Sequence, residues 1–249
     1  MIPQLKAVAR DLIRSYELWK FKGNKVFCTI CGSSFDSFAP YGPRPNAKCP
    51  ECGAVERHRL LWKYLNDKTN FRTWDNINLL HFAPEKVFHK IFSTLPIHYF
   101  PCVLFPEDFY LKDGVKVQKG DITAIPFEDN FFDVEICSHV LEHIEDDRRA
   151  MSELYRVMKP GGWGIFQVPI DYSLEKTYED FSITSLEGRK KAFGQEYHVR
   201  WYGNDYKDRL ASVGFKVTVD NYVKTFSKEE IEKYAFEGYE LVYYCRKQL

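Results

Sequence analysis

Short apolar runs alternate with helical patterns over most of the chain. From about residue 77, runs rich in Val, Ile, Leu and aromatic residues are followed by stretches with apolar positions at helical spacing. This alternation is typical of a parallel sheet whose strands are connected by helices. We expect strands at residues 77–82, 98–104, 115–120, 133–140, 162–169, 215–221 and 240–246.

Two helices have recognisable boundaries in this pattern. One is predicted over residues 146–159, because the Pro-Gly-Gly run that begins at Pro160 cannot continue it. The other is predicted over residues 56–67, where apolar side chains recur on one face. It follows the last cysteine of a cluster, so we interpret it as the connection between the cysteine region and the large domain.

Two further segments look like helical additions to the sheet. Residues 171–197 are polar and aromatic and are suited to a lid. Residues 222–238 contain Ser227 followed by Glu230, the spacing of a capping box. Both segments could instead be packing elements.

Four of the seven cysteines form two closely spaced pairs. Cys28 and Cys31 make one C-x-x-C pair, and Cys49 and Cys52 make a second one 17 residues later. Each pair directs two thiolates to one point, and two pairs complete a tetrahedral site for Zn²⁺. A glycine follows each pair, where the turn needs a permissive backbone. Four thiolates leave no open coordination position, so we predict a structural zinc ribbon.

Disulfide bonds are the alternative for these cysteines. They persist mainly in oxidising compartments, and the chain shows no export signal at its first residues. The most apolar run, residues 163–170, is too short to span a bilayer. We therefore favour zinc and expect a cytoplasmic protein with no membrane span.

The charge of the chain divides near the end of the cysteine region. The whole sequence has 35 basic and 35 acidic residues, but residues 1–66 hold 11 Lys and Arg against 5 Asp and Glu. The remainder is acidic, which indicates two parts with different tasks. We expect an N-terminal helix at 1–23, a zinc ribbon at 24–56 and a large domain at 57–249. The basic residues near the ribbon form either a solvated rim or a phosphate contact; they are Arg44, Lys48, Arg57, His58 and Arg59.

Composition narrows the class of protein. Apolar residues make up 45% and charged residues 28% of the 249 positions, as in globular proteins. These values exclude a disordered tail and a polycationic nucleic-acid coat. The acidic large domain also argues against a long groove for RNA.

Four motifs in the large domain follow one another in a familiar order. They begin at Asp121 (DITAIPF), Phe132 (FD), His139 (HVLEHI) and Glu153 (ELYRVMKPGG). This series resembles class I S-adenosylmethionine-dependent methyltransferases. The cysteine pairs together with the motifs around residues 80–85 and 193–205 are similar, more narrowly, to bacterial members with an N-terminal zinc ribbon.

The resemblance implies a Rossmann-like α/β fold, with a seven-stranded, mostly parallel sheet preceded by the small zinc ribbon. It also implies an enzyme that uses S-adenosylmethionine. Ligands of such sheets bind at the carboxyl ends of the strands. The implied cofactor residues are His81, Ala83, Glu85, Glu107, Asp121, Ile122 and Ser138.

Two positions depart from the usual methyltransferase pattern. The first turn contains Ala83 where a glycine-rich stretch is usual, and Val103 occupies the place of the acid that binds the ribose. Glu107 and Asp108 are the candidates to replace that acid. Glu85 could accept a hydrogen bond from the cofactor's ammonium group or cap the following helix.

Methyl transfer to a hydroxyl requires an aligned acceptor and removal of one proton. His139, His143 and His198 are the candidate bases, and a buried structural role is the alternative for each. Arg200 and Tyr202 are candidate substrate-binding residues, since arginine suits a phosphate or carboxylate on the acceptor.

The residues from His139 to His143 also spell H-x-x-E-H, a metalloprotease signature. Here the motif follows a strand, and the sequence places no third ligand beside it. We therefore do not assign it a metal.

The leading hypothesis is methyl transfer to an oxygen of a small-molecule, sugar or glycan-linked acceptor. One alternative is an RNA methyltransferase that docks its substrate on the basic ribbon, so a nucleic-acid partner is less favoured but open. The other is a pseudo-methyltransferase that acts as a binding module. The sequence does not specify an oligomeric state.

Overall fold

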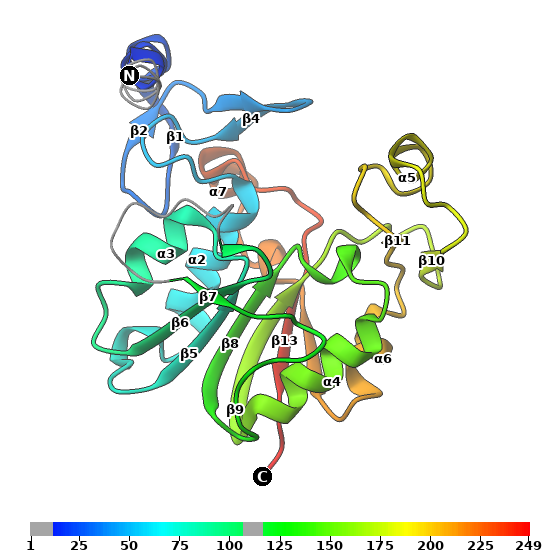
Figure 1. Cartoon of the computed structure of the whole chain (residues 1–249). Helices are drawn as coiled ribbons and strands as arrows, with labels where there is room; N and C mark the ends of the chain where they lie inside the picture. The colour runs from blue at the N-terminus through cyan, green and yellow to red at the C-terminus, as the bar shows by residue number, and fades with distance from the viewer. Residues whose placement is uncertain (1–11, 107–116) are drawn as a thin grey trace, which may run out of the picture. The chain divides into compact units, whose positions relative to one another are not determined.

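A seven-stranded sheet forms the larger of two units in the computed structural model, which describes residues 12–106 and 117–249. This unit contains residues 74–220 and 242–249. Its strands lie in the order β12-β13-β9-β8-β5-β6-β7 (Figure 1). Their bounds are β5 Asn78–Phe82, β6 His98–Val103, β7 Gln118–Lys119, β8 Phe132–Ser138, β9 Met158–Gln167, β12 Lys216–Asp220 and β13 Val242–Arg246.

The strand directions confirm the predicted Rossmann-like sheet. Strands β7, β6, β5, β8 and β9 pair in parallel, and β13 runs antiparallel to both β9 and β12. The chain proceeds outward from β5 through β6 to β7, then returns to the other side of β5 to form β8 and β9. The order therefore reverses between β5 and β8, and sheets of this kind bind ligands at the carboxyl ends beside that point.

The boundary between α4 and β9 differs from the prediction by several residues. Helix α4 (Asp147–Val157) ends two residues earlier than expected, and β9 already begins at Met158. The Pro-Gly-Gly run therefore lies within the strand rather than before it. Met158 pairs with Phe132 of β8, and the amide of Gly161 donates to the carbonyl oxygen of Lys247 at 2.9 Å. These tertiary bonds stabilise an extended backbone where local propensity indicated only the end of a helix.

The core of the larger unit is built on β8. Phe132, Val134, Ile136 and Cys137 of this strand are buried, and α4 lies across one face of the sheet (Figure 1). Helix α4 has Asp146 as its N-cap, whose side chain accepts from the amide of Arg149. The remaining helices are α3 Lys86–Phe92, η3 Leu141–His143, α5 Leu186–Phe193 and α6 Tyr206–Ala211.

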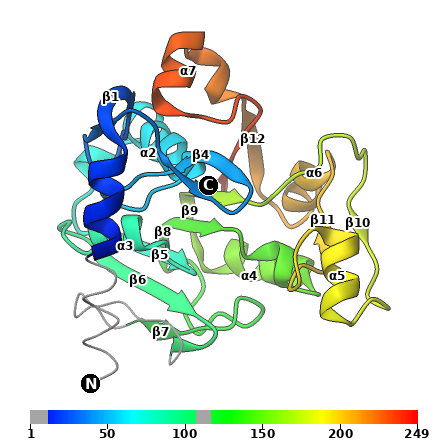
Figure 2. The ribbon, with the colours of Figure 1, turned by 90° about the horizontal axis from the view of Figure 1, so that it is seen from above.

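The predicted addition at residues 171–197 contains β10 (Tyr178–Glu179) and α5. Strand β10 pairs antiparallel with β11 (Arg200–Trp201), and Figures 1 and 2 show both strands beside α5. The side chain of Ser185 caps α5 by accepting from the amide of Gly188. This addition therefore has its own small sheet.

The smaller unit combines residues 1–73 with residues 221–241. Its described strands form two antiparallel pairs, β1 with β2 and β3 with β4. The chain thus leaves the large sheet after β12 and returns to it at β13. The bounds are β1 Lys22–Phe27, β2 Ser34–Phe35, β3 Ala39–Tyr41, β4 Arg44–Lys48, α2 Glu56–Lys68, η1 Phe71–Thr73, η4 Tyr222–Thr225 and α7 Lys228–Tyr234, and residues 12–20 are also helical.

The capping box predicted at the start of α7 is present. The Ser227 hydroxyl accepts from the amide of Glu230 at 3.2 Å, and the Glu230 carboxylate accepts from the amide of Ser227 at 2.9 Å. Because both orphan amides are satisfied, the helix begins at the residue after Ser227. This segment is therefore a helical addition, as its sequence indicates.

Arg59 connects the two chain segments of the smaller unit. Its side chain is fully buried and donates to the carbonyl oxygens of Ala47, Ala54, Tyr234 and Ala235 at 2.8–3.0 Å. The guanidinium also lies 4.1 Å from the ring centre of Phe38. Arg59 therefore belongs neither to a solvated rim nor to a phosphate contact. Among the residues described, no helix is long and apolar enough to cross a membrane.

Candidate functional site

The turn after β5 contains Ala83 in the left-handed backbone region, with φ 46°. An L-residue rarely adopts this conformation, and such positions are concentrated at functional sites. The amide of Ala83 donates to the carbonyl oxygen of Cys102 at 2.9 Å, which holds the turn against β6. The turn that the sequence analysis assigned to the cofactor thus has the backbone shape that glycine usually supplies.

A hydrogen-bonded chain lies directly behind this turn. His81 is fully buried, with its Nε2 2.9 Å from a carboxylate oxygen of Glu85 and its Nδ1 3.0 Å from the Tyr99 hydroxyl. The same hydroxyl lies 3.3 Å from Nδ1 of His89. Burial is the main cause that raises the pKa of Tyr99 well above its usual range, so its hydroxyl stays protonated. The buried His81 side chain therefore fixes the orientation of the Glu85 carboxylate through their hydrogen bond.

The other predicted cofactor residues lie at the ends of β6, β7 and β8. Val103 ends β6 and is buried, and Glu107 falls outside the described residues. Asp121 follows β7 and is exposed; its Oδ1 accepts from the amide and hydroxyl of Thr123 at 2.8 and 2.7 Å. Ile122 is buried beside it, and Ser138 ends β8 with 7% of its surface exposed.

A second residue with a left-handed backbone follows β8. His139 has φ 56°, and its amide donates to the carbonyl oxygen of Gln167 on β9 at 2.8 Å. The bend directs the chain into η3, which carries Glu142 and His143. Of the non-glycine residues with a left-handed backbone that the structure describes, Ala83 and His139 lie at the carboxyl ends of the two strands that flank the reversal of strand order.

Three histidines surround the buried carboxylate of Glu142. Oε1 of Glu142 lies 3.2 Å from Nδ1 of His139, 4.0 Å from Nε2 of His143 and 3.9 Å from Nε2 of His198. The Glu142 side chain is 1% exposed. Burial is the main cause that lowers the pKa of His198, with the Glu142 carboxylate opposing it. The structure thus brings the three predicted bases together.

Arg200 and Tyr202 contribute to this cluster from inside the protein. Both side chains are fully buried. Arg200 donates to Glu179 at 2.8 Å and to the carbonyl oxygens of Leu141, Ile144 and Glu145 around η3. The Tyr202 hydroxyl donates to Asp147 at 2.8 Å. In place of the predicted contact with substrate, these side chains hold the segment that carries Glu142 and His143.

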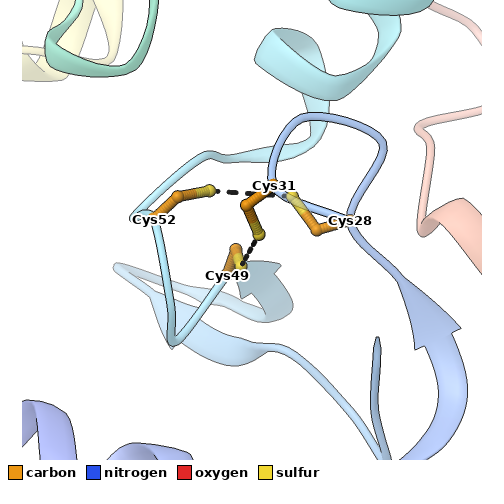
Figure 3. Close-up of side chains that lie close together, drawn as sticks. All are labelled: Cys28, Cys31, Cys49 and Cys52. Carbon is orange, nitrogen blue, oxygen red and sulfur yellow. Dashed lines mark hydrogen bonds between the residues drawn. The ribbon is translucent and has the colours of Figure 1, made fainter. Parts of the chain in front are cut away.

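The four cysteines of the smaller unit lie close together, with their sulfur atoms within 4.8 Å of one another (Figure 3). The sulfur atoms of Cys28 and Cys52 are 3.7 Å apart, as are those of Cys31 and Cys49. Zn–S bonds of about 2.3 Å at tetrahedral angles separate sulfur atoms by about 3.8 Å, whereas a disulfide needs about 2.05 Å. The sulfur spacing therefore fits zinc.

The two cysteine turns have the same backbone pattern. In each, the amide of the following glycine donates to the carbonyl oxygen of the first cysteine at 2.9 Å. Gly32 and Gly53 have φ 75° and 76°, which explains why glycine occupies both positions. This agrees with the prediction made from the sequence.

Comparison with known proteins bears on the larger unit. Residues 105–166 match the family described as "Methyltransferase domain". The chain of a complex between the Haloferax volcanii Trm112 methyltransferase activator and a methyltransferase aligns with a TM-score of 0.52 at 15% identity, covering 78% of this chain and 91% of that one. The larger unit therefore contains a segment that matches the methyltransferase domain family, and it has the fold of class I methyltransferases.

Two curated relatives match part of this chain. A demethylmenaquinone methyltransferase of Streptomyces avermitilis is 39% identical over 79 residues, which are 28% of this chain and 34% of the relative. A ubiquinone/menaquinone biosynthesis C-methyltransferase of Francisella tularensis is 31% identical over 86 residues, which are 33% of this chain and 34% of the relative. The match spans about a third of the length of each.

The methyltransferase domain also contains a pair of residues whose role the sequence analysis did not assign. Glu153 and Arg156 of α4 form an ion pair at 2.7 Å. Glu153 accepts from the amide of Ile125, and Arg156 donates to the carbonyl oxygens of Ile125 and Phe127 at 2.9 Å. The pair therefore fixes the loop that follows Asp121. The pair is visible in the sequence as the ELYR segment. Its Glu153 and Arg156 are three residues apart and therefore lie on one face of the helix.

Proposed function

We propose that the protein transfers the methyl group of S-adenosylmethionine to an oxygen atom of a small-molecule, sugar or glycan-linked acceptor. The observation that carries this proposal is the group of three histidines around Glu142 at the carboxyl end of β8. Oxygen acceptors have to lose a proton when the new bond forms, and a neutral imidazole is the common base near neutral pH.

The cofactor would lie along the carboxyl ends of β5 to β8. Asp121 is proposed to accept a hydrogen bond from the adenine amino group, with the amide of Ile122 as a donor. Glu85, oriented by His81 at 2.9 Å, is proposed to receive the cofactor's ammonium group. Ala83 allows close approach of the backbone, and Glu107 is proposed as the ribose ligand. Ser138 would then lie beside the transferred methyl group.

The reaction itself is a substitution at carbon. The acceptor oxygen forms a bond to the methyl carbon while the carbon–sulfur bond breaks and sulfur keeps the electron pair. The protein has to align the three reacting atoms, which can contribute several kcal/mol to catalysis. The left-handed turns at Ala83 and His139 are proposed to fix that alignment, because their strain persists only where surrounding contacts hold it.

A carbon acceptor is the second candidate. One relative with 31% identity over 86 residues is named as a C-methyltransferase. Activated ring carbons also lose a proton after attack, so the histidine group would serve either reaction. The nature of the acceptor therefore needs a chemical test of the product.

An RNA acceptor is less favoured, because two basic residues near the ribbon have internal partners. Arg59 is buried on four carbonyl oxygens, and Arg44 is paired with Glu56. Binding of RNA through the remaining basic residues would be steeply weakened by salt.

The test is transfer of a labelled methyl group from S-adenosylmethionine to fractionated cell extract, before and after nuclease treatment. The labelled product is then heated with hydroiodic acid, which releases methyl groups from ethers and leaves those bound to carbon. Nuclease-resistant, acid-labile label supports the proposal. Acid-stable label supports the carbon acceptor, and loss of label with nuclease supports RNA. Absence of label in every fraction contradicts methyl transfer.

A further inference from the structure

We infer that Glu142, His143 and His198 bind a divalent transition-metal cation that holds the acceptor's hydroxyl oxygen. This inference rests on the proposed methyl transfer and specifies how the acceptor is bound. The candidate ligand atoms, one from each residue, lie within 4.8 Å of one another. Ligands about 2.1 Å from one cation are about 3.0–4.2 Å apart, depending on the bond angle. The measured separations of 3.9 and 4.0 Å from Glu142 fall in that range.

The Glu142 carboxylate is the strongest sign that a cation belongs there. Its side chain is 1% exposed, and neither oxygen has a hydrogen-bond partner among the described residues. The contact with His139 at 3.2 Å does not have hydrogen-bond geometry. Buried carboxylates in proteins are normally paired, hydrogen-bonded or bound to a metal, because burial without a partner is costly.

The imidazoles of His143 and His198 each direct Nε2, the nitrogen proposed to bind the metal, toward the Glu142 carboxylate. Nδ1 of His143 lies 3.0 Å from the carbonyl oxygen of Tyr197, and Nδ1 of His198 lies 3.2 Å from that of Phe193. Since a carbonyl only accepts, each Nδ1 carries the hydrogen. In the neutral rings, each Nε2 therefore has a free lone pair on the side of Glu142. Histidines that bind metals in proteins have this arrangement, with the second nitrogen donating to a carbonyl or carboxylate.

Backbone hydrogen bonding brings His198, which is distant in the sequence, close to Glu142 and His143. The amide of Val199, next to His198, donates to the carbonyl oxygen of Glu142 at 2.9 Å. Arg200 then donates to the carbonyl oxygens on both sides of Glu142, at Leu141 and Ile144. His198 is therefore the third ligand that the H-x-x-E-H segment lacks in the sequence. Arg200 acts as a positioning residue for the site.

Solvent access suits a site that also takes a substrate. His143 has 32% of its side chain exposed and His198 has 12%, whereas Glu142 is covered. Three protein ligands leave coordination positions open for one or two acceptor oxygens. Two histidines and one carboxylate favour cations such as Mn²⁺, Fe²⁺, Co²⁺ or Zn²⁺ over Ca²⁺.

The cation would activate the acceptor by lowering the pKa of its bound hydroxyl. With the cation bound, His143 and His198 serve as its ligands and not as bases. The hydroxyl then gives its proton to water, its oxygen bonds to the methyl carbon, and sulfur leaves with the electron pair of the broken bond. The products are a methyl ether, S-adenosylhomocysteine and one proton in solution. His139, whose Nδ1 faces Glu142, would orient the carboxylate from outside the ligand set.

Mn²⁺ is the suitable probe, because thiolate sites such as the cysteine cluster prefer Zn²⁺. Zinc-loaded protein is titrated with Mn²⁺, and free Mn²⁺ is measured by electron paramagnetic resonance. We expect one Mn²⁺ per chain, and at least about tenfold weaker binding in His143→Ala and Glu142→Gln. His98→Ala, which removes an exposed histidine outside the cluster, is the matched control and should bind as the wild type does.

Circular dichroism and zinc content verify that each variant is folded. If His143→Ala does not fold, the comparison of Mn²⁺ affinity rests on Glu142→Gln. No binding at millimolar Mn²⁺, or equal binding by all variants, would overturn the inference. Calorimetry with S-adenosylhomocysteine on the same preparation separates the two proposals. Cofactor binding without Mn²⁺ binding contradicts only the metal site, whereas Mn²⁺ binding without cofactor binding contradicts the proposed methyl transfer.

Discussion

The imidazole rings of His143 and His198 lie edge to face, with their centres 4.8 Å apart. The two residues come from different segments, η3 and the turn before β11, and share one buried carboxylate as their neighbour. Their backbones are joined by the hydrogen bond between Val199 and Glu142. This relationship joins Glu142 and His143, which follow β8, with His198 in one three-residue cluster. The cluster therefore includes a residue from the segment after β9.

The zinc ribbon gives the first prediction. Purified protein should contain one zinc per chain, and Cys28→Ser combined with Cys49→Ser should abolish binding, because the site then retains two thiolates. Structural zinc contributes about 10–16 kcal/mol of apparent binding energy in small fingers, so the smaller unit should unfold. Elemental analysis and thermal denaturation are the measurements. Cys102→Ala, which removes a buried cysteine outside the cluster, should keep the zinc.

Asp121 tests the assignment of the adenine site. Asp121→Ala should weaken binding of S-adenosylhomocysteine about tenfold, a loss of about 1.4 kcal/mol, which is typical for one hydrogen bond to a charged group. Asp180→Ala is a matched control, since Asp180 accepts from the amide and hydroxyl of Ser182 in the same way. Calorimetric titration measures both. Equal affinities of wild type and Asp121→Ala would show that the adenine assignment is wrong.

The buried hydrogen bonds of Arg59 predict that residues 221–241 and the rest of the smaller unit stabilise each other. Arg59→Lys would leave several buried carbonyl oxygens without their donor, at about 1–3 kcal/mol for each unsatisfied group. We expect a clear fall in the midpoint of thermal unfolding and faster proteolysis within residues 221–241. Arg72→Lys, on the exposed side of η1, should leave both unchanged. Unchanged stability of Arg59→Lys would contradict the role assigned to this arginine.

The burial of Glu135 predicts that the stability of the protein depends on pH. This residue of β8 is fully buried, and burial raises the pKa of its carboxyl well above the usual range. The unfolded chain ionises it near pH 4.3, so its contribution to stability is present below that pH and is lost as pH rises toward the folded-state value. Glu135→Gln should lack this loss. The measurement is chemical denaturation of both proteins between pH 4 and 8, and a difference that does not change with pH would contradict the prediction.

The sheet and the cysteine site could be predicted because their signals are local. Apolar runs, the Pro-Gly-Gly segment and the two C-x-x-C pairs each report a structure formed within a few residues. The boundary at Met158 differs from the prediction because pairing with Phe132 outweighs the local turn signal. Tertiary hydrogen bonds of that kind are not visible in a single sequence.

The candidate site could be predicted only in part. The three histidines were identified one at a time, but their convergence on Glu142 depends on a contact between segments far apart in the chain. The sequence suggests Arg200 and Tyr202 as substrate-binding residues, since arginine suits a phosphate or carboxylate on the acceptor. Their complete burial depends on Glu179 and Asp147, which no spacing in the sequence connects to them.

We expect the larger unit to bind S-adenosylmethionine as a methyltransferase domain does. Isothermal titration of the purified protein with S-adenosylhomocysteine, the product of methyl transfer, measures this binding. We predict saturable heat for one site per chain, with a dissociation constant below the millimolar range. Absence of binding at millimolar ligand, with a folded and zinc-loaded protein, would contradict it.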